Sequence, residues 1–406
     1  MAEQDYSYII VGAGQAAGTA IEGIRDMDDE GSILLIGNEE YLPYERPPLS
    51  KKLWFGKKTI DDIFVQSKDF YIDNFVDLML STEAVGLDAR NKRITDSKGN
   101  AWTYDNLLLA TGGTPRKLSI PGADLEGICY YRYLDDYKNI RAQAMENKTA
   151  LVIGGGFIGS ELAAALNINK VQVTMIYPED YLVQRVFPQS LALSLENKFL
   201  DRGIMIFKGD VPTSIEKVDG RFLTHTRDGK TIESDFIIAG AGIIPNTKLA
   251  EMAGLQVGNG IIVDENLQTS FDSIYAAGDV ANFPYQALGT HTRVEHWDNA
   301  REQGKHAGWN MAGKGIAYDY MPYFYSDLFE FGYEAVGEVD SRLDTVQDWQ
   351  KENDTGVIYY LKDKKIRGVM TCNLYGKMDD ARQLIRSGKE VIPKDLFGMI
   401  GMRSAA

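Results

Sequence analysis

The sequence contains few of the residues that bind metals or exchange disulfides. Only two cysteines occur among 406 residues, Cys129 and Cys372, and they are too far apart to form a C-x-x-C pair. The 4 histidines include no pair with the H-x-x-x-H spacing of a zinc site. We therefore expect no metal centre, no iron–sulfur cluster and no dithiol chemistry within this chain.

Long apolar runs and an excess of positive charge are also missing. No apolar stretch approaches the roughly 18 residues of a membrane-spanning helix, so no membrane span is expected. The 43 Lys and Arg against 58 Asp and Glu give a net charge of −15, which disfavours nucleic acid as a partner. The acidic residues 1–5 fit neither a secretory nor a transit peptide, so a cytoplasmic protein or a processed organellar form is expected.

The first dinucleotide motif lies at residues 8–18. An apolar stretch stops at Gly12 and Gly14, and a small-residue segment containing Ala17 follows. The first glycine permits a turn, the second admits a pyrophosphate, and the small residue lets the helix pack on the strand. A second strand at 32–36 leads to Glu39, which can accept from ribose hydroxyls. Because the motif begins so close to residue 1, the expected cofactor is FAD.

The same arrangement recurs at residues 150–161. Gly154, Gly156 and Gly159 have full G-x-G-x-x-G spacing, and a strand at 171–177 ends near Glu179. Two such arrangements in one chain predict two dinucleotide sites. A carboxylate at Glu179 would accept from ribose hydroxyls and repel a ribose phosphate, so we expect NADH to be preferred over NADPH.

Other strands end in residues suited to ligands. Thr111 and Gly112 follow an apolar strand, and Asp279 follows another, at the strand ends where ligands gather in open α/β sheets. A proline-rich loop at 42–51 is expected to be rigid and to lead into a helix at Ser50. A second helix is expected from Arg293 onward, with its N-terminus toward the flavin.

These signals predict an α/β fold with two Rossmann-like dinucleotide-binding domains, for FAD and NAD, and a small α+β C-terminal domain. The predicted FAD domain covers residues 1–118 and 241–320, and the NAD(H) domain covers 119–240. The C-terminal domain covers 321–406. Within it we expect strands at 331–337, 356–361 and 364–372 and a helix at 378–387.

With these motifs in hand, the chain resembles the pyridine-nucleotide FAD oxidoreductases of the ferredoxin and rubredoxin reductase group along its whole length. Within that group it looks most like the apoptosis-inducing factor family. Tyr325 stands where the family usually has Trp, and Asn38 stands where many relatives have an acid. The shared segments are LPYERPPLSK at 42–51, ATGGTPR at 110–116, GGGFIGSE at 154–161, VEH at 294–296, FYSD at 324–327 and GYEAVG at 332–337.

The resemblance implies a set of contacts for each cofactor. For FAD these are Gly12, Gly14, Glu39, Arg46, Lys51 and Asp279, with His296 near the flavin ring. For NAD(H) they are Gly156, Phe157, Ile158, Glu161, Glu179, Arg185 and Gly242, with Glu295 and Glu334 near the nicotinamide. Catalytic roles are predicted for Lys51, Glu161, Phe157 and His296. We predict an ion pair between Lys51 and Glu161 beside the flavin, with Tyr325 and Phe324 covering the ring.

The expected activity is hydride transfer from NADH to FAD, with a long-lived charge-transfer complex, and then electron transfer to an acceptor. The acceptor, whether a small carrier protein, a quinone or oxygen, is not identified by the sequence. One alternative is a dedicated NADH-dependent ferredoxin or rubredoxin reductase that docks its carrier on Lys51, Lys52, Lys57 and Lys58. Another is a redox-sensing interaction protein whose turnover is incidental. The oligomeric state is left open, a homodimer included.

Overall fold

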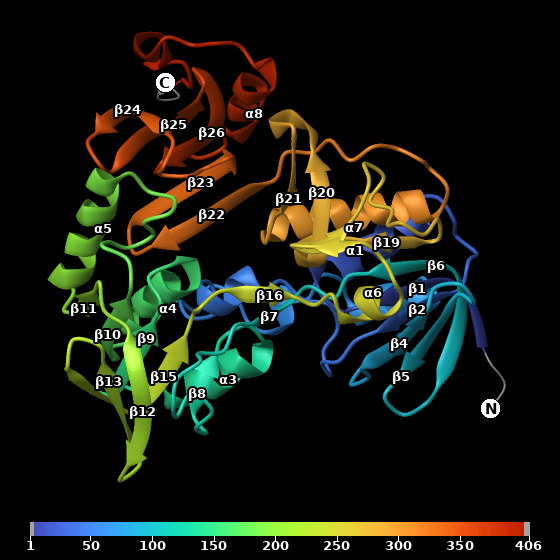
Figure 1. The fold of residues 1–406 in the computed structure, drawn as a ribbon, viewed down its shortest axis with the longest axis horizontal. Coiled ribbons are helices and arrows are strands. Elements are labelled where there is room, and N and C mark those ends of the chain that lie inside the picture. Colours follow the sequence, from blue (N-terminus) through green and yellow to red (C-terminus); the bar gives the residue numbers. More distant parts are fainter. Residues whose placement is uncertain (1–3, 402–406) are drawn as a thin grey trace. The chain divides into compact units, whose positions relative to one another are not determined.

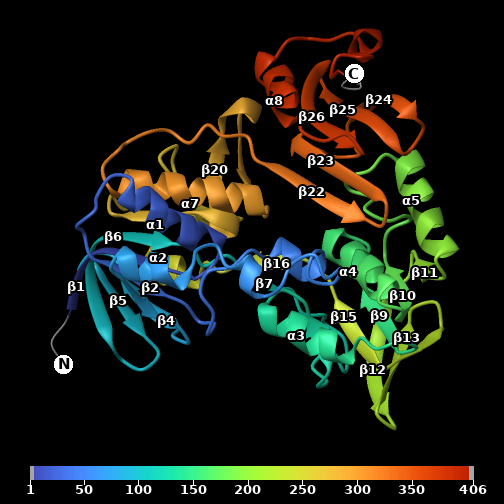
Figure 2. The same cartoon turned by 180° about the vertical axis from the view of Figure 1, so that it is seen from behind.

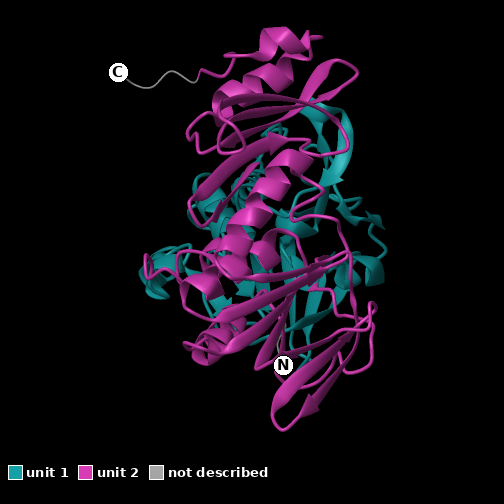
Figure 3. Ribbon diagram, turned by 90° about the vertical axis from the view of Figure 1, so that its left-hand side faces the viewer, with its two compact units in different colours: residues 1–46, 59–114, 244–322 teal, residues 47–58, 115–243, 323–406 magenta. Residues whose placement is uncertain are grey.

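The structure is a computed structural model that describes residues 4–401. The chain forms two compact units, coloured separately in Figure 3. The first contains the described residues of 1–46, 59–114 and 244–322, and the second those of 47–58, 115–243 and 323–406. Segment 47–58 and the C-terminal segment thus belong to the same unit as the second glycine motif, which differs from the predicted division. The three-domain boundaries stay a prediction.

A seven-stranded sheet forms the core of the first unit, with the order β3-β2-β1-β6-β5-β4 and with β19 paired to β6. Strands β3, β2, β1, β6 and β19 run parallel, so their carboxyl ends meet at one edge, where Val11 pairs with both Ile36 and Leu109. The central strands are buried on both faces. The strands are β1 (Gln4–Val11), β2 (Ile33–Ile36), β3 (Val76–Met79), β4 (Ala84–Asp88), β5 (Arg93–Asp96), β6 (Ala101–Leu109) and β19 (Ile274–Ala276).

Two helices of the first unit, α1 (Gln15–Arg25) and α7 (Trp297–Met311), pack side by side (Figures 1 and 2). Gly304 makes the close approach possible, because a Cβ there would lie 2.2 Å from the Ala16 carbonyl oxygen. The unit also contains two short helices and a four-stranded sheet. These are α2 (Lys68–Asp73), α6 (Lys248–Met252), β17 (Val257–Gly258), β18 (Gly260–Ile262), β20 (Ala281–Tyr285) and β21 (Thr290–Arg293).

The second unit contains a parallel five-stranded sheet in the order β11-β10-β9-β15-β8, with three helices in its connections. Its strands are β8 (Ile128–Tyr130), β9 (Thr149–Ile153), β10 (Gln172–Tyr177), β11 (Met205–Lys208) and β15 (Phe236–Ala239), and its helices are α3 (Leu134–Gln143), α4 (Phe157–Ile168) and α5 (Gln189–Asp201). An antiparallel sheet of β12 (Pro212–Val218), β13 (Arg221–Thr226) and β14 (Thr231–Ser234) packs on its core.

An antiparallel sheet in the order β22-β23-β26-β25-β24 also belongs to the second unit. Helix α8 (Met378–Ser387) packs on β23 and β26. The three strands and the helix predicted for this region are confirmed, whereas β22 and β24 were not predicted. The strands are β22 (Tyr323–Leu328), β23 (Phe331–Gly337), β24 (Asp344–Lys351), β25 (Thr355–Lys362) and β26 (Lys365–Cys372).

The helix predicted to begin at Ser50 is wrong. A 3₁₀ helix, Pro47–Ser50, ends where that helix was expected, and residues 51–56 continue as turns. The Leu53 N–H, which a helix would pair with the Leu49 carbonyl oxygen, donates to the Pro48 carbonyl oxygen at 3.1 Å instead, and the Leu49 carbonyl oxygen accepts from the Trp54 indole N–H at 2.7 Å. Strands β7 (Gly113–Pro115) and β16 (Ile243–Pro245) pair with each other. Each contains a point at which the chain passes from one unit to the other. Among residues 4–401, none of the helices combines the length and apolar character needed to cross a membrane.

Candidate functional site

The first glycine loop joins β1 to α1. Gly12 has a φ of +114°, and a Cβ there would lie 2.2 Å from the Ala110 carbonyl oxygen, so only glycine fits. Gly14 caps α1 in an extended conformation, and a Cβ there would have nothing within 4 Å. The first amides of α1 are therefore open to an anion, as a pyrophosphate requires. Ala17 is fully buried at the base of the helix.

Glu39 lies beyond β2, where a ribose would be expected, and it is already held by two side chains. The Tyr44 hydroxyl donates to Glu39 Oε2 at 2.6 Å, and Arg46 reaches Oε1 at 3.1 Å. The Arg46 guanidinium lies 5.2 Å from the centre of the Tyr44 ring. Each carboxylate oxygen has further acceptor capacity, so Glu39 stays the predicted ribose acceptor, with a fixed orientation.

Asp279 lies in a 3₁₀ turn, η3 (Gly278–Val280), directly after β19 at the carboxyl edge of the sheet. Gln303, on α7, holds this turn, because its Oε1 accepts from the Gly278 N–H at 2.9 Å. Gln303 is fully buried, and its Nε2 has no hydrogen-bond partner among the described residues. A buried donor of this kind beside Asp279 fits a bound polar cofactor such as FAD.

Glu295 and His296 precede α7. Glu295 forms an ion pair of 2.5 Å with Arg293, whose NH1 also donates to the Asp279 carbonyl oxygen at 3.0 Å. His296 is the N-cap residue, so the helix begins at Trp297, later than predicted, because β21 continues to Arg293. The predicted placement of Glu295 at the nicotinamide and of His296 at the flavin stays a prediction.

Thr111 and Gly112 lie at the end of β6 in the first unit, where Thr111 is hydrogen-bonded to Asn246. The Thr111 hydroxyl donates to the Asn246 carbonyl oxygen at 2.8 Å, and the Asn246 side-chain amide donates back to the Thr111 carbonyl oxygen at 2.8 Å. Gly112 has a φ of +61°. This reciprocal pair fixes the end of β6, where ligand contacts were predicted.

The second glycine loop joins β9 to α4 in the second unit. A Cβ on Gly154 would lie 2.5 Å from the Gly240 carbonyl oxygen, and one on Gly159 would lie 2.0 Å from the Gly154 carbonyl oxygen. A Cβ on Gly156, which caps α4, would have nothing within 4 Å. The open N-terminus of a 12-residue helix suits the pyrophosphate of a second dinucleotide. Ile158 is exposed beside it.

The Lys51–Glu161 ion pair predicted from the sequence is present. Lys51 Nζ lies 2.6 Å from Glu161 Oε1, and the two side chains are 7% and 5% exposed. The Ser50 hydroxyl donates to Glu161 Oε2 at 2.5 Å, and the Ser326 hydroxyl donates to Oε1 at 2.6 Å. Removing one partner of such a pair leaves an uncompensated buried charge, which costs about 3–5 kcal/mol. Both serines lie in shared segments, at 42–51 and 324–327, but no contact with Glu161 was predicted for either.

One aromatic ring lies over this ion pair, and two more pack against each other on α4 and β22, the elements that carry Glu161 and Ser326. Lys51 Nζ lies 5.5 Å from the centre of the Tyr325 ring, and the Phe157 and Phe324 ring centres are 5.5 Å apart. Glu334 lies opposite Tyr325 on the neighbouring strand. Burial raises the pKa of the Glu334 carboxyl, and a hydrogen bond of 3.1 Å from the Gly376 N–H partly offsets this. Six residues with predicted roles thus lie on neighbouring segments of the second unit: Lys51, Glu161, Phe157, Phe324, Tyr325 and Glu334.

The predicted ribose acceptor of the second site, Glu179, follows β10 and is half-buried. Its carbonyl oxygen accepts from the Gly209 N–H at 3.0 Å, which fixes the backbone at that point. Arg185 is exposed on the segment that follows. Gly242, with a φ of +87°, accepts from the Arg116 N–H at 2.9 Å at the end of the same sheet.

The basic cluster proposed as a docking surface needs correction. Lys51 is buried in the ion pair with Glu161 and is not available at the surface. Lys52 and Lys57 are exposed, and Lys58 is half-buried. Any docking surface on segment 47–58 must therefore rest on the remaining lysines.

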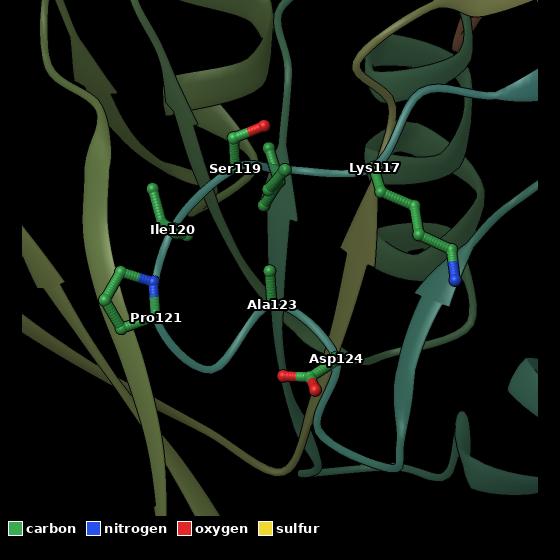
Figure 4. A pocket seen from close by; sticks show the side chains of 7 residues that line it. Lys117, Ser119, Ile120, Pro121, Ala123 and Asp124 are labelled. Carbon is green, nitrogen blue, oxygen red and sulfur yellow. The ribbon is translucent and has the colours of Figure 1, made fainter.

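Two other features carry none of the predicted chemistry. A pocket of about 360 Å³ is lined by residues 117–121, 123 and 124, and none of the predicted site residues lines it (Figure 4).

Burial raises the pKa of both thiols, Cys129 and Cys372, so they remain protonated near neutral pH. The cysteines are therefore unsuited to carry electrons as thiolates.

Comparison with known proteins matches most of the chain. Residues 6–304 match the family described as pyridine nucleotide-disulphide oxidoreductase, and residues 307–355 match the C-terminal domain of mitochondrion-associated apoptosis-inducing factor. The chain is 34% identical to apoptosis-inducing factor 1 of Dictyostelium discoideum, over 94% of this chain and 78% of that protein. It is 35% identical to monodehydroascorbate reductase 3 of Arabidopsis thaliana, over 90% and 89%.

A solved ferredoxin reductase from Rhodopseudomonas palustris is similar to the whole fold. Its TM-score is 0.89 at 30% identity, with 96% of each chain covered. The predicted fold class and the resemblance given above are thereby confirmed.

Proposed function

The chain belongs to the pyridine nucleotide-disulphide oxidoreductase family, and from this premise we propose that it transfers a hydride from NADH to FAD and then passes electrons to an acceptor. Its cofactors are FAD and NAD(P)H, and it is an enzyme. The finer proposal adds that NAD⁺ and the reduced flavin remain together as a charge-transfer complex. FAD accepts the hydride and can release electrons onward, while the protein supplies binding, orientation and charge.

The buried Lys51–Glu161 pair is the observation that carries this proposal. Glu161 lies in the first two turns of α4, the helix whose N-terminus is open at the second glycine loop. Lys51 reaches Glu161 from the proline-rich segment at a distance of 2.6 Å. A positive charge is therefore held at a fixed place relative to the loop proposed to bind NADH. Two serine hydroxyls donate to the Glu161 carboxylate and fix its orientation, and the carboxylate in turn holds Lys51.

We assign Lys51 the role of stabilising the negative charge that a flavin gains on reduction. A buried ammonium interacts strongly with a nearby anion because little water screens it. Glu161 supplies the opposite charge that a buried lysine requires. Tyr325, Phe157 and Phe324 are proposed to exclude water and oxygen from the reacting rings, which would make the charge-transfer complex long-lived.

Anaerobic titration of the FAD-loaded protein with NADH tests the proposal. We expect bleaching of the flavin and a broad long-wavelength band that persists for minutes after air is admitted. Lys51→Met should slow flavin reduction by about tenfold or more and lower the midpoint potential. Lys52→Met, which removes the exposed neighbouring lysine, is the control and should leave both values unchanged. Unchanged rate and potential in Lys51→Met would refute the role.

A second candidate, an NADH-dependent reductase of a small iron–sulfur carrier, is favoured by the exposure of Lys52 and Lys57 and by the similarity to a ferredoxin reductase. Rapid turnover with ferredoxin and fast release of NAD⁺ would support it. Combining Lys52→Met with Lys57→Met should then raise the KM for the carrier only. If the band persists and ferredoxin, quinones and monodehydroascorbate are all poor acceptors, a redox-sensing role is favoured.

A further inference from the structure

A buried glutamate on α5 occupies a position that the helix otherwise fills with apolar residues. Its buried side chains are Leu191, Ala192, Leu195, Glu196 and Phe199, and Glu196 is 3% exposed. A buried carboxylate is costly unless its oxygens are hydrogen-bonded. Glu196 meets this condition with three donors, so its contacts show what the charge is used for.

The donors to Glu196 come from both ends of one loop and from a neighbouring strand. The Tyr177 hydroxyl donates to Oε1 at 2.7 Å, and the Leu182 N–H donates to the same oxygen at 3.0 Å. Lys208, on β11, donates to Oε2 at 2.9 Å. Tyr177 ends β10 and Leu182 lies beyond Glu179, so one carboxylate oxygen closes the loop 178–183, which we call the acidic loop.

The acidic loop is also joined to the second glycine loop. The Val183 N–H donates to the Gly155 carbonyl oxygen at 2.8 Å. Tyr177 packs its ring against Gly155 so closely that a Cβ there would lie 2.7 Å from the ring. Val183 has a φ of +52°, a left-handed conformation that β-branched residues rarely adopt. Neighbouring contacts must therefore hold Val183 in this strained conformation. One of them is the hydrogen bond from the Leu182 N–H to Glu196.

We propose that Glu196 is a positioning residue for the adenosine half of the nicotinamide dinucleotide. It fixes the acidic loop against the second glycine loop, and so sets where the Glu179 carboxylate meets the ribose. The inference rests on the proposed function, in which this region binds NADH. Glu196 does not touch the dinucleotide, because it lies in the core behind the loop and acts through Tyr177 and Leu182.

The test separates the two halves of the dinucleotide. ADP-ribose carries the adenosine half without nicotinamide, and reduced nicotinamide mononucleotide carries the other half without adenosine. In Glu196→Ala, the affinity for ADP-ribose measured by calorimetry should fall about tenfold, the cost of leaving buried donors unpaired. The KM for NADH should rise similarly, while kcat and the rate of flavin reduction by the mononucleotide should not change. The preference for NADH over NADPH should also weaken.

Milder variants keep the inference testable if Glu196→Ala does not fold. Tyr177→Phe keeps the ring on Gly155 and removes one donor, so it should weaken ADP-ribose binding in the same direction. Lys208→Met removes only a half-exposed ion pair and should change affinity less than about fivefold. Glu233→Ala, which breaks the exposed pair with Arg221 on the same unit, is the matched control and should change nothing.

The outcomes distinguish this inference from the proposed function. Unchanged ADP-ribose affinity in both Glu196→Ala and Tyr177→Phe would overturn the inference and leave the proposed function standing. An equal loss of reduction by the mononucleotide would also overturn it, because Glu196 would then support the whole unit. If the wild-type protein neither binds ADP-ribose nor is reduced by NADH, both the proposed function and this inference fail.

Discussion

The two glycine loops are built on the same backbone plan. Gly12 and Gly154 have φ angles of +114° and +120°, and in each case a Cβ would collide with a carbonyl oxygen of a neighbouring strand end. Gly14 and Gly156 each cap a helix and face open space. The first two glycines of each motif therefore do the same two jobs, a forced turn and an open anion site.

The loops differ at the third small residue. The first loop has Ala17, whose methyl group is buried, and the second has Gly159, where a Cβ would lie 2.0 Å from the Gly154 carbonyl oxygen. Helix α4 therefore approaches its strand too closely for any side chain at this position. The second loop has less tolerance for substitution than the first.

The loops also differ in how their acidic residues are held. The Glu39 carboxylate accepts a hydrogen bond from the Tyr44 hydroxyl and forms an ion pair with Arg46. Glu179 is fixed through its backbone, while the buried Glu196 holds the ends of its loop. Under the proposed function, we predict that Glu39 contacts a cofactor that stays bound, and that Glu179 contacts a dinucleotide that binds and leaves in each cycle.

The largest expected effect comes from the first glycine of each motif. Gly12→Ala should yield protein that lacks FAD, because the new Cβ would lie 2.2 Å from the Ala110 carbonyl oxygen. Gly154→Ala should retain FAD and lose NADH binding. Flavin absorbance of the purified variants and calorimetry with NADH check both. Loss of FAD from both variants alike would contradict a division of the cofactors between the two loops.

Substitutions at the two third positions should both destabilise the protein, but to different degrees. Gly159→Ala should destabilise the protein and weaken NADH binding, since the Gly154 carbonyl oxygen lies 2.0 Å from the added atom. Ala17→Gly should cost only about 1 kcal/mol, the penalty for glycine within a helix. Thermal unfolding with and without NADH provides the measurement. Equal losses of stability in Gly159→Ala and Ala17→Gly would mean that the closer approach of α4 to its strand does not affect stability.

Removing the charge of Glu179, the acidic residue of the second site, should have a smaller and more selective effect. Glu179→Gln should reduce the ratio of kcat/KM for NADH to that for NADPH by about tenfold, since it removes repulsion of the ribose phosphate. Asp180→Asn changes the exposed neighbour and serves as the control. A ratio that stays constant in Glu179→Gln would show that this carboxylate does not face the ribose.

Local patterns predicted much of this architecture from the sequence. Glycines with positive φ, apolar strands and capped helices act within a few residues, so both loops and the elements around them could be located. The Lys51–Glu161 pair was predicted because the family motifs placed both residues, not because their spacing requires a contact. The helix expected at Ser50 is absent because the Trp54 indole N–H bonds to the Leu49 carbonyl oxygen that a helix would pair with the Leu53 N–H.

What the sequence could not predict depends on contacts between distant segments. Ser326 reaches Glu161 only because the C-terminal sheet and α4 belong to one folded unit. Glu196 interrupts the apolar face of α5, and its partners become visible only when β10 and the acidic loop are in place. Single polar residues of this kind have no periodicity, so three-dimensional packing alone reveals them.

The last expected effect is on stability and not on cofactor binding, and it concerns the start of the strand that leads to the second loop. Asp235 accepts from the Thr149 N–H at 2.8 Å and from its hydroxyl at 2.9 Å, and it pairs with Lys148 at 3.0 Å. Burial alone would raise the pKa of Asp235, but these partners lower it to about 2. Because the folded pKa lies below the unfolded value, the carboxylate stabilises the fold above about pH 4, and this contribution disappears as the pH falls toward 2.

Asp235→Asn should therefore lower the free energy of unfolding by about 1–2 kcal/mol at pH 7, and the difference from wild type should shrink below pH 4. Denaturant unfolding at several pH values measures this.

In the first unit, a hydrogen bond from the Tyr6 hydroxyl to Asp77 at 2.7 Å likewise joins two segments, β1 and β3. Tyr6→Phe should weaken that unit without altering NADH affinity, because NADH is proposed to bind the second glycine loop, which belongs to the other unit. A change in NADH affinity in Tyr6→Phe, or a constant difference for Asp235→Asn down to pH 2, would contradict this account of how the two strands are anchored.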